Sequence, residues 1–341
     1  MIGASMPVDA ESHNPEFDQA VLPSYFAPLP VSALPLSRHG LDRDYLARSA
    51  PDLFESLRLN PRMRQLVLWK GKALLGPSGE LDLLPHDAEL DATLRLYLGR
   101  SLEPDFFEDP VVAVIVGDKA AITLAPIESD PGESRWGDLR NLGSSFSASD
   151  AGLFTAALAL ANWHDSHRFS PRTGMATIAG QGGWVRTDVE SGREVFPRTD
   201  PAIIVGIVDS RDRLLLGHNA MWPANRYSLL AGFVEPGESL ESAVLREVFE
   251  ESGVRIVDPV YVGSQPWPFP ASLMVGFIAK VDPDLESTLT PDGTEILDLR
   301  WFSREELTAS LDDIGLPGHT SIARAIIEHW YGGPIADRRQ W

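Results

Sequence analysis

The clearest alternation of hydrophobic and polar positions lies in the C-terminal half of the chain. The apolar stretch 202–209 (AIIVGIVD), the polar pair Arg211-Asp212 and a second apolar stretch, 213–219 (RLLLGHN), predict two strands joined by a turn. Further strands are predicted near 259–264, 272–281 and 297–302, and a helix near 320–330. Strands interleaved with helices predict an α/β sandwich.

The N-terminal half has a mixed pattern that predicts an α+β domain without catalytic motifs. Residues 65–85 and 111–126 resemble strand pairs, the first turning at Gly71 or Gly79 and the second at Gly117-Asp118. The run 149–164 (SDAGLFTAALALANWH) predicts a helix that begins at Ser149 or Asp150.

At 341 residues the chain is too long for one typical domain, so two or three are expected. The pattern divides it into a polar, disordered tail (1–20), the N-terminal α+β domain (21–168), a short Gly-rich connector (169–198) and a C-terminal α/β domain (199–335). No internal repeat is present.

Composition narrows the class of protein. The absence of cysteine excludes disulfides and thiolate zinc ligands. No apolar run is long enough to span a bilayer, and Met1–Asn14 lacks a basic, apolar secretory leader, so we expect a cytoplasmic protein with no membrane partner. A formal charge of −20 disfavours a general nucleic-acid binder, although a local basic pocket remains compatible with it.

The stretch 232–254 (GFVEPGESLESAVLREVFEESGV) predicts a helix with clustered carboxylates. Ser239 can cap it and Gly253 can end it. At roughly 100° per residue, Glu247, Glu250 and Glu251 fall within an arc of about 100° on one face. Arg246, one turn before Glu250, could hold the carboxylate of Glu250 in place.

Two interpretations of this acidic face are possible. An isolated EVFEE would most simply be a solvated helix face with an Arg–Glu pair. Carboxylate oxygens are also the ligands that Mg²⁺ and Mn²⁺ prefer. Because Gly232, Pro236-Gly237 and Glu238 precede the helix at fixed offsets, we favour a metal site here.

A second motif, 264–272 (SQPWPFPAS), begins ten residues past this stretch. Pro266, Pro268 and Pro270 keep the backbone extended and remove three amide donors. Trp267 and Phe269 are thereby presented as stiff aromatic surfaces. The alternative is a rigid edge connection whose rings fill the core.

These two motifs resemble known ones. The stretch 232–254 is similar to the Nudix box, the loop–helix–loop of hydrolases that cleave a diphosphate linked to another group. SQPWPFPxS at this offset resembles the NudC-like NAD(H) diphosphatases. The resemblance covers about half of the chain. It implies a Nudix α/β/α sandwich and metal-dependent hydrolysis of the pyrophosphate bond of NADH or NAD⁺ to NMN(H) and AMP.

The resemblance also implies roles for individual residues. Glu247 and Glu251 would bind Mg²⁺ or Mn²⁺ beside the family's arginine, Arg246, and Glu250 would be a further ligand or orient the attacking water. The carbonyl of Ala231 would complete the coordination. Glu295 falls where the family has a distant catalytic or metal-binding glutamate, although it could be an ordinary loop carboxylate.

The implied substrate-binding residues surround this centre. They are Phe196, Phe233, Gln265, Pro266, Trp267, Pro268, Phe269, Pro270, Ala271, Ser272 and Ala323. Phe233 would stack on one base or on the nicotinamide, and Phe196 stands where the family usually has Tyr. Because the sandwiching ring can come from the other subunit in the family, we expect a homodimer.

The connector departs from the family pattern, which has a four-cysteine zinc ribbon here. The corresponding positions are Ser170, Thr173, Asp188 and Ser191. Three hydroxyls and one carboxylate cannot hold a structural zinc. We therefore predict a degenerate, zinc-free ribbon held by Trp184, Ile178 and Phe196. His164 and His167, three residues apart, lack evident partners for another metal site and are expected to be structural.

Other functions remain open at this stage. The same chemistry could act on ADP-ribose, a dinucleoside polyphosphate or a nucleotide sugar, or could remove NAD caps from RNA 5′ ends. Capped RNA would need a basic track, and Arg193, Arg198, Arg300 and Arg324 could form one. A non-catalytic nucleotide sensor is the alternative from another class, but such a protein would be expected to lose a metal-binding glutamate, and none is lost here.

Overall fold

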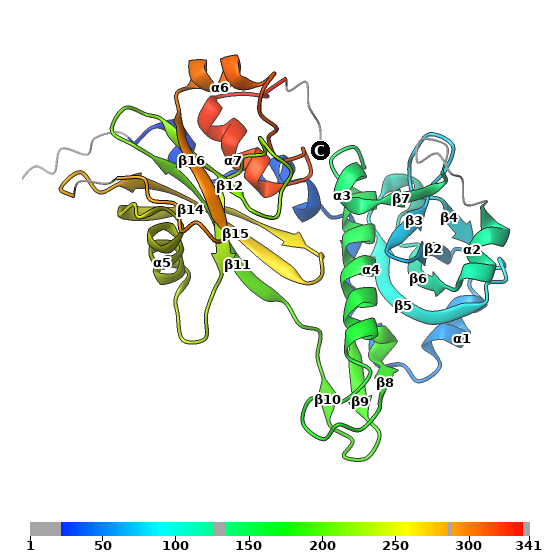
Figure 1. Ribbon diagram of the computed structural model, residues 1–341. Coiled ribbons are helices and arrows are strands. Elements are labelled where there is room, and N and C mark those ends of the chain that lie inside the picture. Colours follow the sequence, from blue (N-terminus) through cyan, green and yellow to red (C-terminus); the bar gives the residue numbers. More distant parts are fainter. Residues whose placement is uncertain (1–21, 126–133, 286–287, 337–341) are drawn as a thin grey trace, which may run out of the picture.

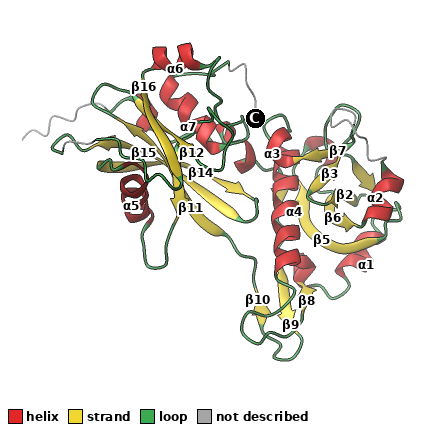
Figure 2. Ribbon diagram, viewed as in Figure 1, coloured by secondary structure: helices red, strands yellow, loops and turns green. Residues whose placement is uncertain are grey.

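The computed structural model describes residues 22–125, 134–285 and 288–336, so the predicted tail, 1–20, lies outside the described residues. Figure 1 shows two mixed units of helices and strands on either side of the long helix α4 (Ala148–Ser166). A small three-stranded connector lies at one end of this helix. Figure 2 shows that strands dominate both units and that helices cover them.

The N-terminal unit is one sheet with helices on both faces. Its strands are β1 (Leu41–Asp42), β2 (Arg64–Trp69), β3 (Lys72–Leu74), β4 (Leu83–Pro85), β5 (Ala92–Ser101), β6 (Pro110–Val116) and β7 (Trp136–Asp138), in the order β1-β5-β6-β2-β3-β7 with β4 beside β2. Helix α4 packs on one face, and α1 (Leu53–Arg58) and α2 (Asp118–Leu124) pack on the other.

One of the two predicted strand pairs is wrong. The pair within 65–85 is present, because β2 and β3 turn at Lys70-Gly71. In 111–126, only β6 is a strand and Asp118–Leu124 is helix α2. This segment contains two alanines, which favour a helix, and Asp118 places a carboxylate at the positive N-terminal end. Asp118 also accepts a 2.7 Å hydrogen bond from Trp69 Nε1.

Helix α4 extends slightly beyond the predicted range, 149–164. Ser147, rather than Ser149 or Asp150, is its cap, and Ser147 Oγ accepts a 3.0 Å hydrogen bond from the Asp150 amide. The helix is buried on most sides because it lies between the two domains. Within the described residues, no helix is both long and apolar enough to cross a membrane.

The connector consists of β8 (Thr177–Gly180), β9 (Val185–Asp188) and β10 (Glu194–Val195) around a buried carboxylate. Asp188 is 1% exposed and accepts hydrogen bonds from the Thr173 hydroxyl and from the amides of Glu190 (2.9 Å) and Ser191 (3.0 Å). The Thr173 hydroxyl, followed by the Ser191 amide, holds the pKa of Asp188 well below its usual range.

Ser170 belongs to the same polar cluster. Its hydroxyl accepts long hydrogen bonds (3.4 Å) from the amides of Arg172 and Thr173 and also helps to lower the pKa of Asp188. The four positions that correspond to zinc ligands in the resembled ribbon are thus joined by hydrogen bonds.

The apolar packing expected of the connector is only partly present. Trp184 packs against the N-terminal unit and donates a 2.7 Å hydrogen bond to the Tyr97 carbonyl. Ile178 and Phe196 are 59% and 63% exposed, so the prediction that they hold the connector is wrong. Three short strands without a covering layer cannot bury these side chains, and polar contacts around Asp188 take their place.

The C-terminal domain is an α/β/α sandwich, as predicted. Its strands are β11 (Asp200–Val208), β12 (Leu214–Asn219), β13 (Leu230–Phe233), β14 (Ile256–Trp267), β15 (Ser272–Val281) and β16 (Ile296–Phe302), in the order β14-β15-β11-β12-β16 with β13 beside β11. Ile203 and Val205 of β11 pack with helix α5 (Leu240–Ser252), whereas Ile204 and Val208 pack with α6 (Arg304–Ser310) and α7 (Ile322–Tyr331).

The first described residues belong to this sandwich, although we predicted them in the N-terminal domain. Tyr25, Phe26 and Leu34 are buried in the core beneath α7. The Leu29 amide donates to the Val262 carbonyl (2.6 Å), and Ser37 Oγ donates to the Ser264 carbonyl (2.6 Å). β14 is an edge strand, so this segment covers backbone groups that would otherwise remain unpaired.

We expect Asp188→Ala to lower the melting temperature by several degrees at pH 7, because three donors lose their acceptor. The folded-state pKa is lowered, so the stabilisation is present above the unfolded pKa of about 4 and is lost as pH falls below it. Circular dichroism melting curves should show that Asp188→Asn differs less from wild type at acidic pH. Glu190→Ala, at an exposed neighbour, is the control. Equal melting temperatures for Asp188→Ala and wild type at pH 7 would contradict this role.

Candidate active site

The helix predicted from the acidic motif is present with the expected ends. Ser239 caps α5 and accepts a 3.1 Å hydrogen bond from the Ser242 amide. Gly253 ends it in the left-handed conformation, with φ of 70°. The apolar face, Ala243, Val244 and Val248, is buried against the sheet. The remaining face carries the glutamates along the edge of the sandwich.

Arg246 connects this helix to the loop before it. Its guanidinium contacts both carboxylate oxygens of Glu238 (2.7 and 2.9 Å) and donates to the Phe233 carbonyl (3.0 Å). It also contacts Glu250 and Glu247, each at 2.9 Å. Arg246 lowers the pKa of Glu238 to about 2. The predicted Arg246–Glu250 pair is confirmed, and Glu238 is the stronger partner.

Glu251 is the most unusual carboxylate in the described chain. It is 5% exposed, and its Oε2 is buried without a hydrogen-bond partner. Burial, followed by the negative charges of Glu247, Glu295, Asp292 and Glu250, raises its pKa to about 8. A buried, unpaired carboxylate is costly, so this position is built for something other than stability.

Glu247 lies against the backbone of the strand that precedes the loop. A Cβ added to Gly232 would stand 2.0 Å from the Glu247 carboxyl carbon. Only glycine therefore permits this approach, which explains the first fixed position of the motif. Burial raises the pKa of Glu247, although the adjacent Arg246 opposes the shift.

Glu295 is positioned by a turn and by a neighbouring amide. Asp292 Oδ1 accepts hydrogen bonds from the amides of Thr294 (3.0 Å), Glu295 (3.0 Å) and Ile296 (2.8 Å). Asn219, where the register of β12 and β16 shifts, donates from Nδ2 to Glu295 Oε1 (3.2 Å). Glu295 is thereby held at the same cavity as Glu251.

This cavity, of about 480 Å³, is the candidate active site. Its lining includes Glu251, Glu295, Ala231, Trp267 and Ala323, all singled out from the sequence. It also includes residues that the sequence analysis missed, namely Arg140, Asn141, Asn219, Trp222 and Arg226.

Arg140 is the most informative of the missed residues. It lies on helix α3 (Leu139–Leu142) of the N-terminal domain. Its guanidinium carbon is 4.4 Å from the centre of the Phe269 ring and 5.3 Å from that of Trp267. No local motif could indicate this, because the contact joins positions more than a hundred residues apart.

The residues of SQPWPFPAS divide among several surroundings, and the expectation that all line one pocket does not hold. Trp267 alone lines the cavity with Glu251. Gln265 is fully buried, accepts from the Leu36 amide (3.2 Å) and donates to the Thr320 carbonyl (2.9 Å). Pro266 lines another cavity, Pro268, Phe269, Pro270 and Ala271 line a third, and Ser272 pairs with Asp200.

The two expected stacking rings lie outside the cavity. Phe233 and Phe196 are 59% and 63% exposed. Their roles in substrate binding stay predictions. His164, by contrast, is buried between the Gly183 carbonyl and Arg186, each 2.7 Å from a ring nitrogen, as expected for a structural histidine.

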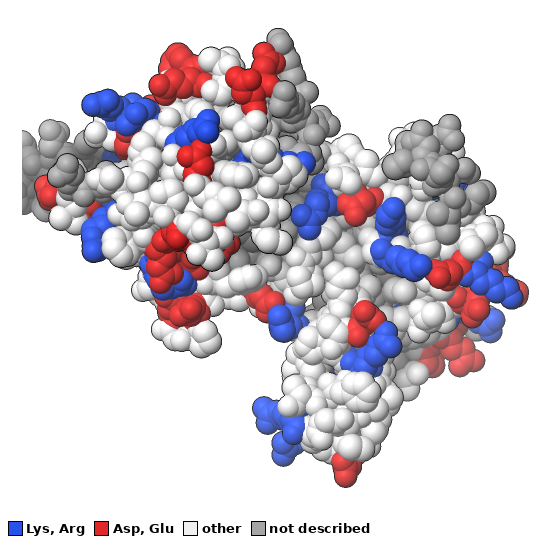
Figure 3. Space-filling view, viewed as in Figure 1, with Lys and Arg blue, Asp and Glu red and all other residues white. Residues whose placement is uncertain are grey.

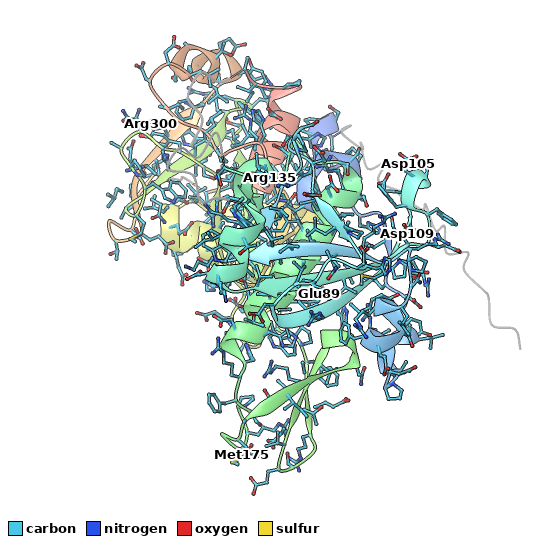
Figure 4. The ribbon with its side chains drawn as sticks, turned by 90° about the vertical axis from the view of Figure 1, so that its right-hand side faces the viewer. Glu89, Asp105, Asp109, Arg135, Met175 and Arg300 are labelled. Atoms are coloured by element: carbon cyan, nitrogen blue, oxygen red, sulfur yellow. The ribbon has the colours of Figure 1, made fainter. Side chains whose placement is uncertain are left out.

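Three of the four arginines considered for a basic track have acidic partners, and the fourth, Arg193, is exposed on the connector. Arg324 is 1% exposed and pairs with Glu328, while Arg198 and Arg300 pair with Asp200 and Asp298. Figure 4 shows Arg300 far from Met175 on the connector. On the face in Figure 3, Lys and Arg are scattered rather than gathered into one basic area.

Within the described residues, no three His, Cys, Asp or Glu side chains are grouped closely enough to form a ready metal cluster. Arg246 draws Glu247 and Glu250 to itself, and Asn219 holds Glu295. The donor set nevertheless suits a divalent cation. Glu251 has a buried, unpaired oxygen and four acidic neighbours, and all the candidate donors are hard oxygen atoms.

Comparison with known proteins agrees with this geometry. A NUDIX domain model matches residues 197–324, and an NADH pyrophosphatase-like rudimentary NUDIX domain model matches residues 61–163. The relatives described next resemble the chain over most of its length. The chain belongs to the Nudix hydrolase family, and within it to the NudC-like proteins, as predicted. Nudix hydrolases are enzymes that use divalent metal ions.

The mycobacterial relatives match more of the chain than the human one does. A protein of Mycobacterium bovis named NAD-capped RNA hydrolase NudC is 40% identical over 86% of this chain and 94% of its own length. The protein of the same name from Mycobacterium tuberculosis is 39% identical over the same shares. Human NAD-capped RNA hydrolase NUDT12 is 37% identical over 53% of this chain and 42% of its own length.

Protonation of Glu251 predicts how stability depends on pH in EDTA. The folded-state pKa of about 8 lies above the unfolded value of about 4.3, so the folded state binds the extra proton. Stability is then highest below the unfolded pKa and falls as pH rises toward 8. Glu251→Gln should flatten this fall and be more stable than wild type at pH 8, by about 1 kcal/mol or more.

Thermal melts from pH 5 to 8 in EDTA measure this difference. Glu241→Gln, an exposed position on the same helix, should keep the wild-type slope. Parallel curves for wild type and Glu251→Gln would mean that Glu251 is ionised throughout this range.

Asn219→Asp provides a test of how Glu295 is positioned. The change keeps the oxygen that accepts the Met221 amide (2.9 Å) and removes the donor to Glu295, adding a repelling charge. We expect the metal concentration for half-maximal activity to rise about tenfold, as for other groups that orient ligands. Asn219→Ala should have a smaller effect. If Asn219→Asp has the wild-type metal dependence, Asn219 does not position Glu295.

Proposed function

We propose that this enzyme hydrolyses the pyrophosphate bond of NADH or NAD⁺, releasing NMN(H) and AMP, with Mg²⁺ or Mn²⁺ as the required ion. The observation that carries the proposal is the unpaired, buried carboxylate of Glu251, in one cavity with Glu295, Trp267 and Arg140. The mycobacterial relatives, named for hydrolysis of NAD-capped RNA, support a substrate that contains NAD.

The acidic residues divide into ligands and orienting groups. We propose that Glu247, Glu251 and the Ala231 carbonyl hold the cations, with Glu295 as a further acidic group of the same cavity. When bound, the cations neutralise the diphosphate, polarise phosphorus and lower the pKa of the attacking water. Glu250, held by Arg246, serves as a further ligand or orients that water. A new P–O bond to water forms as the bridging P–O bond breaks.

Several residues act by holding these groups in position. Arg246 fixes Glu238, Glu247 and Glu250 relative to one another, and Asn219 and Asp292 fix Glu295. Fixed charges of this kind are effective because they need no reorganisation during the reaction. Arg140 and Arg226 add positive charge to the cavity, and Arg140 is suited to face a phosphate of the substrate.

We propose that one aromatic group of the dinucleotide stacks near Trp267 and that Ala323 leaves room for it. Ala323 is 2% exposed and lines the same cavity, where a larger side chain would take up space. The exposed rings of Phe196 and Phe233 would enclose the other end. Because both rings lie outside the cavity, we propose that a second copy of the chain covers them in a homodimer.

Removal of the NAD cap from RNA is the second candidate, favoured by the names of the mycobacterial and human relatives. Free dinucleotide and capped RNA share the bond to be cleaved. The acidic partners of Arg198, Arg300 and Arg324 disfavour long RNA contacts, so recognition would be limited to the cap and the nucleotides next to it. We also propose that the protein functions without zinc, since hydrogen bonds to Asp188 join the connector.

Glu251→Gln should reduce turnover of NADH and NAD⁺ at least about 100-fold with little effect on folding. The expected products of the wild-type enzyme with Mn²⁺ or Mg²⁺ are NMN(H) and AMP, resolved by chromatography, and EDTA should abolish them. Glu241→Gln, on the same helix but away from the cavity, should have wild-type activity. Unchanged turnover in Glu251→Gln would exclude Glu251 as a ligand, and intact dinucleotide with the wild type would exclude NAD(H) as substrate.

A further inference from the structure

A second cavity, of about 450 Å³, lies between the two domains and has a basic lining. Its walls come from residues 36–43, helix α4, Trp184 of the connector, residues 197–199 and Pro266 of β14. Four of the lining residues are basic, namely Arg38, His39, Arg43 and Arg198. None of the described residues that line it is Asp or Glu, in a chain with a formal charge of −20.

Two of these guanidinium groups have no carboxylate partner among the described residues. Arg38 donates only to the carbonyls of Pro35 (2.9 Å) and Gly143 (2.8 Å). Burial lowers the pKa of Arg38, and no acidic neighbour offsets this shift. The guanidinium carbon of Arg43 lies 5.2 Å from the centre of the Trp184 ring, and this guanidinium has no polar partner in the described chain. Arg198, in contrast, is neutralised by Asp200.

Arg48, which does not line the cavity itself, adds positive charge next to it. The guanidinium carbon of Arg48 is 3.7 Å from the centre of the Trp184 ring, and Arg48 donates to the Arg43 carbonyl (2.9 Å). Its Nε is buried without a hydrogen-bond partner. Arg43 and Arg48 thus bring two like charges to one aromatic ring. Burial, followed by the charge of Arg43, lowers the pKa of Arg48, whereas Asp44, which also pairs with Arg100, raises it.

The walls of this cavity are rigidly built. A Cβ added to Gly152 of α4 would lie 2.8 Å from the His39 Cα, so residues 38 and 39 pack directly on the helix. The segment is also tied to β14 by the hydrogen bonds of Leu36 and Ser37. Hydroxyls of Ser37, Thr155 and Thr199 lie among the lining residues and could donate to an anion.

We propose that this cavity binds the phosphate group of a nucleotide or of a nucleotide chain. Its volume suits a small ligand, and arginines with few competing partners are suited to phosphate oxygens. The end of β14, which carries the start of the SQPWPFPAS motif, separates this cavity from the active site. Pro266 lines the basic cavity and Trp267 lines the catalytic one. A ligand in the basic cavity would therefore contact the strand that carries Trp267. This proposal does not depend on the identity of the hydrolysed substrate.

Calorimetric titration of the full-length protein with inorganic pyrophosphate in EDTA tests the proposal. EDTA removes divalent ions from the acidic cavity, and variants at Arg43 and Arg140 distinguish binding in the basic cavity from binding in the catalytic one. We expect wild type to bind pyrophosphate and Arg43→Gln to bind about tenfold or more weakly, as expected for loss of a charge-assisted contact. Arg58→Gln, an exposed helix position, and Arg140→Gln, in the catalytic cavity, should bind as wild type does.

Absence of binding by wild type, or equal binding by Arg43→Gln at an unchanged melting temperature, would overturn the proposal. AMP and an NAD-capped oligonucleotide then identify the source of the phosphate. If AMP binds in EDTA with the same dependence on Arg43, the ligand is a free nucleotide. If AMP does not bind, and Arg43→Gln raises KM for the capped oligonucleotide but not for NAD⁺, the ligand is the phosphodiester of the RNA. Pyrophosphate binding without NAD hydrolysis would keep this proposal and exclude the proposed function.

Discussion

The site depends on one guanidinium group. Arg246 is shared by Glu238, Glu247, Glu250 and the carbonyl of Phe233, so it joins the loop to the helix and separates carboxylates that would otherwise repel one another. Glu251, which lacks this cation, keeps a raised pKa. Glu238, Glu247 and Glu250 are thus neutralised by Arg246, whereas Glu251 remains available to bind a cation. The buried, unpaired carboxylate of Glu251 lowers the stability of the fold, and a divalent ion bound there can restore this stability.

The sequence predicted the structural features that depend on the spacing of residues close together in the chain. The ends of α5 and the Arg246–Glu250 pair both follow from positions within one helix and its caps. It did not predict α2, because the length and apolar content of 118–124 fit a strand as well as a helix, and Gly117-Asp118 can begin either a turn or a helix. Arg140 was missed because its contact with Trp267 and Phe269 depends on the packing of two domains.

The connector is organised around one buried carboxylate. Ser170, Thr173, Asp188 and Ser191, which we matched to the ligand positions of the resembled zinc ribbon, are joined through hydrogen bonds to this carboxylate. We expected apolar packing instead, but Ile178 and Phe196 are exposed. A buried carboxylate that accepts several hydrogen bonds can hold two short loops together where there is too little apolar surface for a hydrophobic core. The sequence carried this information in Asp188, the one charged residue of the four.

The SQPWPFPAS motif at the end of β14 contributes to two different cavities. Pro266 and Trp267 are adjacent in sequence but face different cavities, as alternate positions of an extended strand do. Gln265 is fixed to the N-terminal segment by the Leu36 amide and to the C-terminal region by the Thr320 carbonyl. Asn162 of α4 donates to the carbonyls of Pro268 and Pro270. The motif is therefore held by both domains, so the N-terminal domain, which has no catalytic motif of its own, shapes the wall of the active site.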